Sequence, residues 1–269
     1  MAVVTNKPLI ADSDRSLFKR LVYPKNADGT PKAPALLVFS CVAVVTIALI
    51  LYRWYMEATA FTAGLDYFEP EFEIYWMSWL YAQGVLITLI GMIGAPAIWF
   101  TRPTIEEVNA ISPSDELGWF MMAFTVLGIG SVVLVCILGV WVEADAAWHQ
   151  VTIRDTDFTP THIQLFYGLI PMLAVGVILI TLWLHTRVPL FVGRFSIPLG
   201  LVACTPIMIM PNLGFNEWGH TFFYAEELFA APVHYGFVVL GWGLFGITGF
   251  LIQCLDRVII LTKLVKVEA

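Results

Sequence analysis

Apolar residues in this chain gather in long uninterrupted runs instead of alternating with polar residues. Each of six runs holds between 18 and 27 residues without Asp, Glu, Lys or Arg, enough for a helix to cross about 30 Å of hydrocarbon. Contiguous runs of this length exclude the alternating strands of an outer-membrane barrel. We therefore predict an all-α integral membrane protein, a bundle of about six transmembrane helices. The predicted spans are Ala35–Tyr52, Ile74–Phe100, Leu117–Val142, Ile163–Leu184, Phe195–Phe215 and Tyr235–Leu255.

The pattern divides the chain into three parts. Residues 1–34 form a polar N-terminal arm, residues 35–257 the transmembrane domain, and residues 258–269 a C-terminal tail. Within the arm, the segment Ser13–Val22 places apolar residues on one helical face. This predicts a short amphipathic helix on the cytoplasmic membrane surface, and a solvated arm is the alternative.

Charge predicts the orientation of the chain in the membrane. Loops on one side carry 12 of the 14 Lys and Arg residues. The other side has only Arg53 and Arg154 but holds 12 of the 21 acidic residues. The positive-inside rule then places both termini of this multi-pass chain in the cytoplasm, in the inner or an intracytoplasmic membrane of the cell. The chain has no basic stripe for RNA or DNA, so we expect no nucleic acid partner.

Four of the five histidines fall in two segments on the acidic side. Each segment has an oxygen-bearing residue, a histidine four positions later and a second histidine 13 or 14 positions further on. The first pair would share one helical face, and the third residue would come from the next helix, leaving open metal coordination positions. This spacing predicts two metal sites. The fifth histidine, His185, has no partner residues at this spacing; it lies near Arg187 and is interpreted as a terminal polar residue of its helix. The two sets are Asp145, His149 and His162, and Asn216, His220 and His234.

Ligand type narrows the metal only in part. The set of Asp145 with two histidines suits iron, zinc or copper. The set of Asn216 with two histidines has no anionic member, which favours Cu(I) bound by imidazoles. A neutral set therefore favours the reduced ion.

Three segments of the chain resemble a known family. They are Phe68–Phe72, Asp145–His162 and Pro211–His234. Together they resemble the C subunit of the copper membrane monooxygenases, which include particulate methane monooxygenase, ammonia monooxygenase and related short-chain hydrocarbon monooxygenases, and the resemblance covers nearly the whole chain. It implies that the two residue sets bind one to two copper ions per chain and that copper activates O₂. Because O₂ requires a reduced, open copper, we expect the neutral set of Asn216, His220 and His234 to be the catalytic site. It also implies A and B subunits as partners, in a trimer of heterotrimers surrounded by membrane lipids.

A few positions depart from the family pattern. Ala144 stands where Gln is common, Tyr224-Ala225 replaces an aromatic residue followed by Met, and Tyr235 replaces a Trp. None of these changes removes a ligand. Since Ala225 leaves space where Met is usual, a short-chain alkane larger than methane is the favoured substrate, with methane or ammonia as alternatives.

The predicted function is therefore that of the C subunit in a copper-dependent membrane monooxygenase that uses O₂ to hydroxylate a small substrate. Two other hypotheses remain open. Interfacial Asp and His residues also occur in proton- or metal-coupled transporters. The metals could also stabilise a structural component of a complex whose partner chain performs the chemistry.

Overall fold

The structure is a computed structural model of the chain and describes residues 17–27, 29–148, 158–203 and 246–268. All of the regular elements in this part of the chain are helices, and a single antiparallel bridge joins Lys25 to Pro31. The helices are α1 (Leu17–Val22), α2 (Ala35–Ala63), α3 (Pro70–Phe72), η2 (Glu73–Met77), α4 (Ser78–Phe100), α5 (Ile105–Asn109), α6 (Pro113–Trp148), α7 (Pro160–Gln164), η3 (Leu165–Leu169), α8 (Ile170–Arg187), α9 (Ile197–Ala203) and α12 (Thr248–Glu268). The predicted all-helical class is confirmed for these residues.

Three helical segments of the described chain are long and apolar enough to cross a membrane. They are Ala35–Ala63, Pro70–Phe100 and Pro160–Arg187, and they contain the first, second and fourth predicted spans. The helices of the second and fourth predicted spans are continuous through short π-helical segments, η2 and η3. In these segments each backbone hydrogen bond spans five residues instead of four. These helices bury few of their own residues, as expected where lipid or partner chains cover the surface.

The other three predicted spans are described in part. Helix α6 extends beyond the predicted span Leu117–Val142 at both ends. Of the predicted span Phe195–Phe215, the structure describes α9 but not the residues after Ala203. Of the predicted span Tyr235–Leu255, it describes only the last residues, from 246 on. The count of six spans therefore stays a prediction. Helix α12 continues through most of the predicted C-terminal tail, 258–269, because this segment contains no proline or glycine and Lys266 suits the C-terminal end of the helix.

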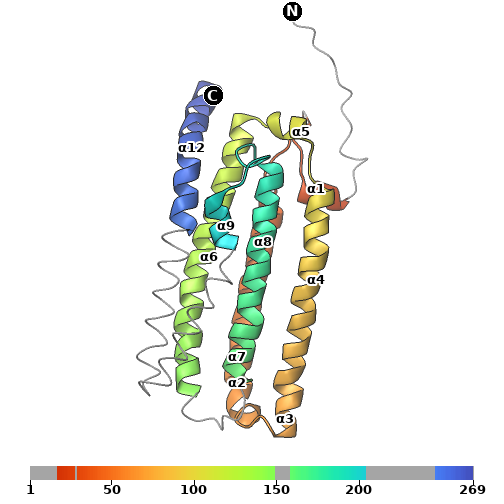
Figure 1. Cartoon of the computed structure of the whole chain (residues 1–269), viewed down its shortest axis with the longest axis vertical. Coiled ribbons are helices and arrows are strands. Elements are labelled where there is room, and N and C mark those ends of the chain that lie inside the picture. Colours follow the sequence, from red (N-terminus) through yellow and green to blue (C-terminus); the bar gives the residue numbers. More distant parts are fainter. Residues whose placement is uncertain (1–16, 28, 149–157, 204–245, 269) are drawn as a thin grey trace, which may run out of the picture.

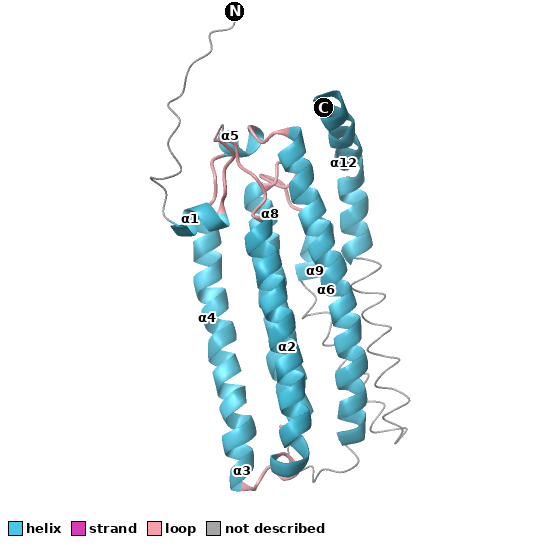
Figure 2. Ribbon diagram, turned by 180° about the vertical axis from the view of Figure 1, so that it is seen from behind, coloured by secondary structure: helices cyan, strands magenta, loops and turns pink. Residues whose placement is uncertain are grey.

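The long helices run side by side along the length of the molecule (Figure 1). Helix α4 packs against α8, and α6 packs against α12, as the reverse view also shows (Figure 2). Two buried apolar clusters hold this bundle together. One is centred on Trp76 and Ile163, between α2, η2 and α7. The other is centred on Trp119, Phe191 and Phe250, between α6, α8 and α12.

Side-chain hydrogen bonds and an ion pair join the helices at the end of the bundle where α5 lies. Glu116, only 2% exposed, accepts two hydrogen bonds from the Arg257 guanidinium of α12, at 2.8 and 2.5 Å. Arg187 is fully buried at the end of α8 and donates to the Ile98 carbonyl at 3.3 Å and to the Thr101 hydroxyl at 2.9 Å. Because the last carbonyls of a helix carry partial negative charge, they stabilise this guanidinium at the end of α4.

Candidate metal centre

The first predicted metal-binding segment leads into α7, at the end of the bundle opposite α5 (Figure 1). Thr159 caps this helix: its hydroxyl accepts a hydrogen bond from the His162 backbone N–H at 3.2 Å. Pro160 occupies the first helical position, where a missing N–H costs nothing. The half-buried imidazole of His162 packs edge-on against Phe166 one turn later, with 5.1 Å between ring centroids. The cap and this ring contact together fix both the backbone and the ring of His162.

The loop between α2 and α3 packs closely on the start of α7. A Cβ atom at Gly64 would lie 2.7 Å from Pro160 Cγ and 2.9 Å from Trp76 Nε1, so only glycine fits between them. Phe158 stacks on Tyr67 of this loop with 6.3 Å between ring centroids. The N-terminus of α7 is therefore held between α2, its following loop and η2, which makes it a rigid platform for a ligand.

The structure brings the elements of two predicted ligands together. Asp145 lies in the last turn of α6, which contacts α7, the helix that carries His162. The last turn of α6 and α7 lie at the same end of the bundle (Figure 1). The third member of the set, His149, follows α6 directly in sequence but lies outside the described residues, as do all members of the second set, Asn216, His220 and His234.

Within the described residues, no group of three His, Cys, Asp or Glu side chains forms a possible metal site. That part of the chain includes at most two members of the first set and none of the second. The oxygen and nitrogen donors of Asp145 and His162 nevertheless suit copper, iron or zinc, and their helices contact each other.

The described residues at this end carry mostly negative charge. Glu69, Glu71 and Glu73 lie in or next to α3 and η2. The one described cation on this side, Arg53, forms an ion pair with Glu57 at 3.1 Å. An excess of carboxylates raises the local concentration of metal cations, which favours metal loading at this end of the bundle.

Buried amides near α7 were not among the residues singled out from the sequence. Gln83 of α4 donates to the Ile163 carbonyl at 2.7 Å, and Gln164 donates to the Tyr52 carbonyl of α2 at 2.9 Å. An amide side chain within an otherwise apolar span is the signal that could have identified Gln83, because buried polar groups in membrane helices require partners.

His185 has a more specific role than the terminal polar residue predicted. Its Nδ1 lies 2.8 Å from the Thr181 carbonyl, which can only accept, so Nδ1 is the donor. Its Nε2 then accepts the Ser196 backbone N–H at 3.2 Å. His185 therefore joins α8 to the start of α9, at the end of the bundle remote from His162.

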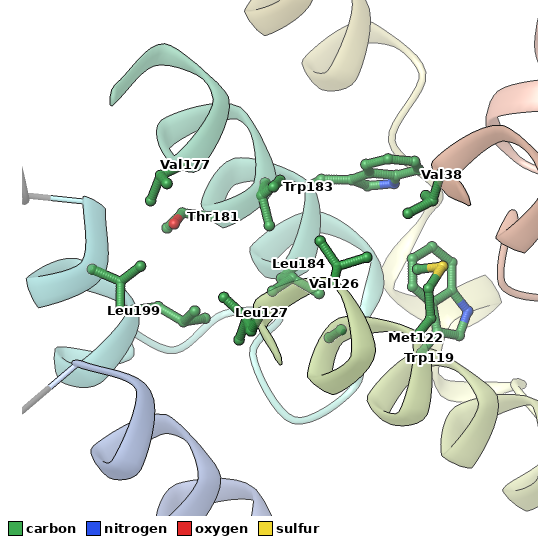
Figure 3. A pocket seen from close by; sticks show the side chains of 13 residues that line it. Val38, Trp119, Met122, Val126, Leu127, Val177, Thr181, Trp183, Leu184 and Leu199 are labelled. Carbon is green, nitrogen blue, oxygen red and sulfur yellow. The ribbon is translucent and has the colours of Figure 1, made fainter. Parts of the chain in front are cut away.

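A small apolar cavity of about 70 Å³ lies between α2, α6, α8 and α9 (Figure 3). Val38, Met122 and Leu184 are among the side chains that line it, together with Trp119. None of the 13 described lining residues is His, Cys, Asp, Glu, Lys or Arg. The cavity can hold a small apolar molecule but offers it no acid or base.

Comparison with known proteins identifies one family. A family model that describes the C subunit of ammonia monooxygenase/methane monooxygenase matches residues 32–268. This range contains both predicted ligand sets. A comparison with individually curated proteins found no match.

Proposed function

Because the chain belongs to the family of the C subunits of ammonia and methane monooxygenases, we propose that it binds copper within a membrane-bound monooxygenase complex. The observation that carries this proposal is the contact between α6, whose last turn contains Asp145, and α7, which begins with the capped turn of His162. His149 follows α6 by one residue, so it is available as the third ligand. Family membership favours this function over the transporter considered from the sequence.

Each residue of the proposed first site has a separate task. Asp145 supplies an anionic oxygen, and His149 and His162 supply neutral imidazole nitrogens. Thr159 and Phe166 hold the backbone and ring of His162 in place. Copper, when bound there or by Asn216, His220 and His234, supplies the redox chemistry that O₂ reduction needs.

We propose a short-chain alkane as the favoured substrate, with methane or ammonia as alternatives. A molecule without a polar handle must be selected by cavity shape and not by hydrogen bonds. Such molecules partition into the bilayer and can reach the chain through its apolar surface. The proposed partners are A and B subunits in a trimer of heterotrimers, since family membership implies a complex of several subunits.

The substrate and the catalytic site are tested with Asn216→Ala and His220→Ala in the assembled complex. We expect both variants to lose turnover of methane, ammonia, ethane and butane, and the unmodified complex to oxidise the alkanes. His185→Gln is the matched control, because this histidine joins two helices at the opposite end. Full activity of both site variants would exclude this site as catalytic, and turnover of ammonia alone would exclude an alkane substrate.

The proposed orientation, with both termini cytoplasmic, is tested by labelling single cysteines with a membrane-impermeant maleimide in right-side-out vesicles. Phe68→Cys and Lys266→Cys are exposed positions at opposite ends of the bundle. We expect Phe68→Cys to react and Lys266→Cys to react only after the membrane is permeabilised. The reverse pattern would contradict the orientation predicted from charge.

A further inference from the structure

Three side-chain hydrogen bonds link α2, α4 and α7 around the residues that follow His162. The Gln83 amide donates from Nε2 to the Ile163 carbonyl at 2.7 Å. The Tyr52 hydroxyl donates to Gln83 Oε1 at 2.7 Å. Gln164 Nε2 donates to the Tyr52 carbonyl at 2.9 Å, which closes the ring. Gln83 is 8% exposed and Gln164 is 1% exposed, so water does not compete for these bonds.

The orientation of the Gln83 amide is fixed by its partners. A carbonyl oxygen can only accept, so the NH₂ group must face Ile163 and Oε1 must face the Tyr52 hydroxyl. The adjacent segment η3 also leaves room for this amide. A Cβ atom at Gly168 would lie 2.4 Å from Gln83 Oε1. The glycine therefore permits the close approach of α4 to η3 that the hydrogen bonds require.

Stability alone does not explain this polar ring inside apolar helices. Hydrogen bonds between membrane helices contribute little net stability, because the separated helices also find partners. They do fix the rotation and height of one helix relative to another. Here α4 holds the Ile163 carbonyl next to His162, and α2 accepts a hydrogen bond from the following residue, Gln164.

We propose that Gln83 is a positioning residue for the metal centre at His162. By holding the Ile163 carbonyl, it sets the rotation of the first turn of α7 and therefore the placement of the His162 imidazole. Gln164 and Tyr52 hold the other side of the same turn. The inference rests on the proposed function, in which His162 binds copper. Residues that orient metal ligands change metal affinity about 10–100-fold when replaced.

The test compares Gln83→Met with the unmodified complex. Met has a similar volume but neither donates nor accepts the two hydrogen bonds. At saturating metal we expect Gln83→Met to keep the copper ion that His162→Ala loses. Its Cu(II) EPR component should be altered, and its copper affinity in chelator competition should fall about 10–100-fold. Gln83→Glu should restore both, because a neutral carboxylic acid at this buried position carries one donor and one acceptor.

Matched controls separate positioning from general damage. Gln253→Met removes another amide of the bundle. Gln253 lies in α12 and accepts a hydrogen bond from the Ser196 hydroxyl at 2.5 Å, so this variant should leave the EPR component unchanged. Tyr52→Phe removes only the hydroxyl that orients Gln83, and it should shift the EPR spectrum in the same direction as Gln83→Met. If Gln83→Met fails to assemble, Tyr52→Phe alone tests the positioning role.

The outcomes separate this inference from the function on which it rests. If His162→Ala keeps its copper, the proposed copper site of Asp145, His149 and His162 fails, and the positioning role of Gln83 fails with it. If His162→Ala loses copper but Gln83→Met and Tyr52→Phe leave the spectrum and the affinity unchanged, only the positioning role is overturned.

Discussion

Replacing His162 by alanine is expected to remove one copper ion from each copy of the chain while the complex still assembles. The cap of α7 should survive, because Thr159 accepts from the backbone N–H of residue 162, not from its ring. Alanine is a strong helix former, so the turn should keep its shape. The substitution therefore removes the imidazole and its contact with Phe166 without removing the helix cap. Elemental analysis of the purified complex measures the copper lost per chain.

A control must show that the loss comes from the ligand and not from the packing around it. Phe166→Leu removes the aromatic contact at 5.1 Å but leaves the imidazole in place. We expect this variant to keep its copper stoichiometry, since it changes only how firmly the ring is held. An assembled His162→Ala complex with unchanged copper would show that Asp145, His149 and His162 do not form a copper site.

The sequence located the membrane helices better than it located their ends. Helix α2 was predicted to end at Tyr52 but continues to Ala63, because Arg53 and Glu57 pair on one face at 3.1 Å and the helix ends only before Gly64. Charge marks where the apolar surface ends, not where backbone hydrogen bonding ends. The same reason extends α12 well past Leu255.

The candidate site was predictable where local spacing decides it. The spacing of the histidines placed His162 at the start of an apolar run, and the structure gives it a capped helical turn there. The ring of Gln83, Tyr52 and Ile163 could not be predicted in the same way. It joins residues 80 positions apart, and it requires the close approach of α4 to η3 at Gly168, which leaves no trace in hydrophobic periodicity.

Breaking the ion pair between Glu116 and Arg257 is expected to destabilise the chain strongly. The Glu116 carboxylate is almost fully buried and accepts both hydrogen bonds from one guanidinium, whereas the Arg257 side chain stays 37% exposed. Arg257→Leu leaves an unpaired buried carboxylate, which costs about 3–5 kcal/mol at such sites. Glu116→Leu should cost less, because the guanidinium left behind can reach water. Thermal unfolding of the purified complex in nanodiscs measures this difference.

The double variant shows whether the pair itself stabilises the bundle. If the cost of Arg257→Leu comes mainly from the stranded carboxylate, adding Glu116→Leu should restore much of the lost Tm, because two leucines can join the apolar contacts between α6 and α12. Glu57→Gln breaks a pair between neighbouring turns of α2 whose carboxylate is exposed, and it should lower the Tm very little. A Tm of Arg257→Leu equal to that of Glu57→Gln would mean that α12 docks on α6 through its apolar face alone. If the double variant has a Tm no higher than that of Arg257→Leu, the hydrogen-bonded pair itself stabilises the bundle. Helix α12 would then depend on Arg257 for its packing against the start of α6.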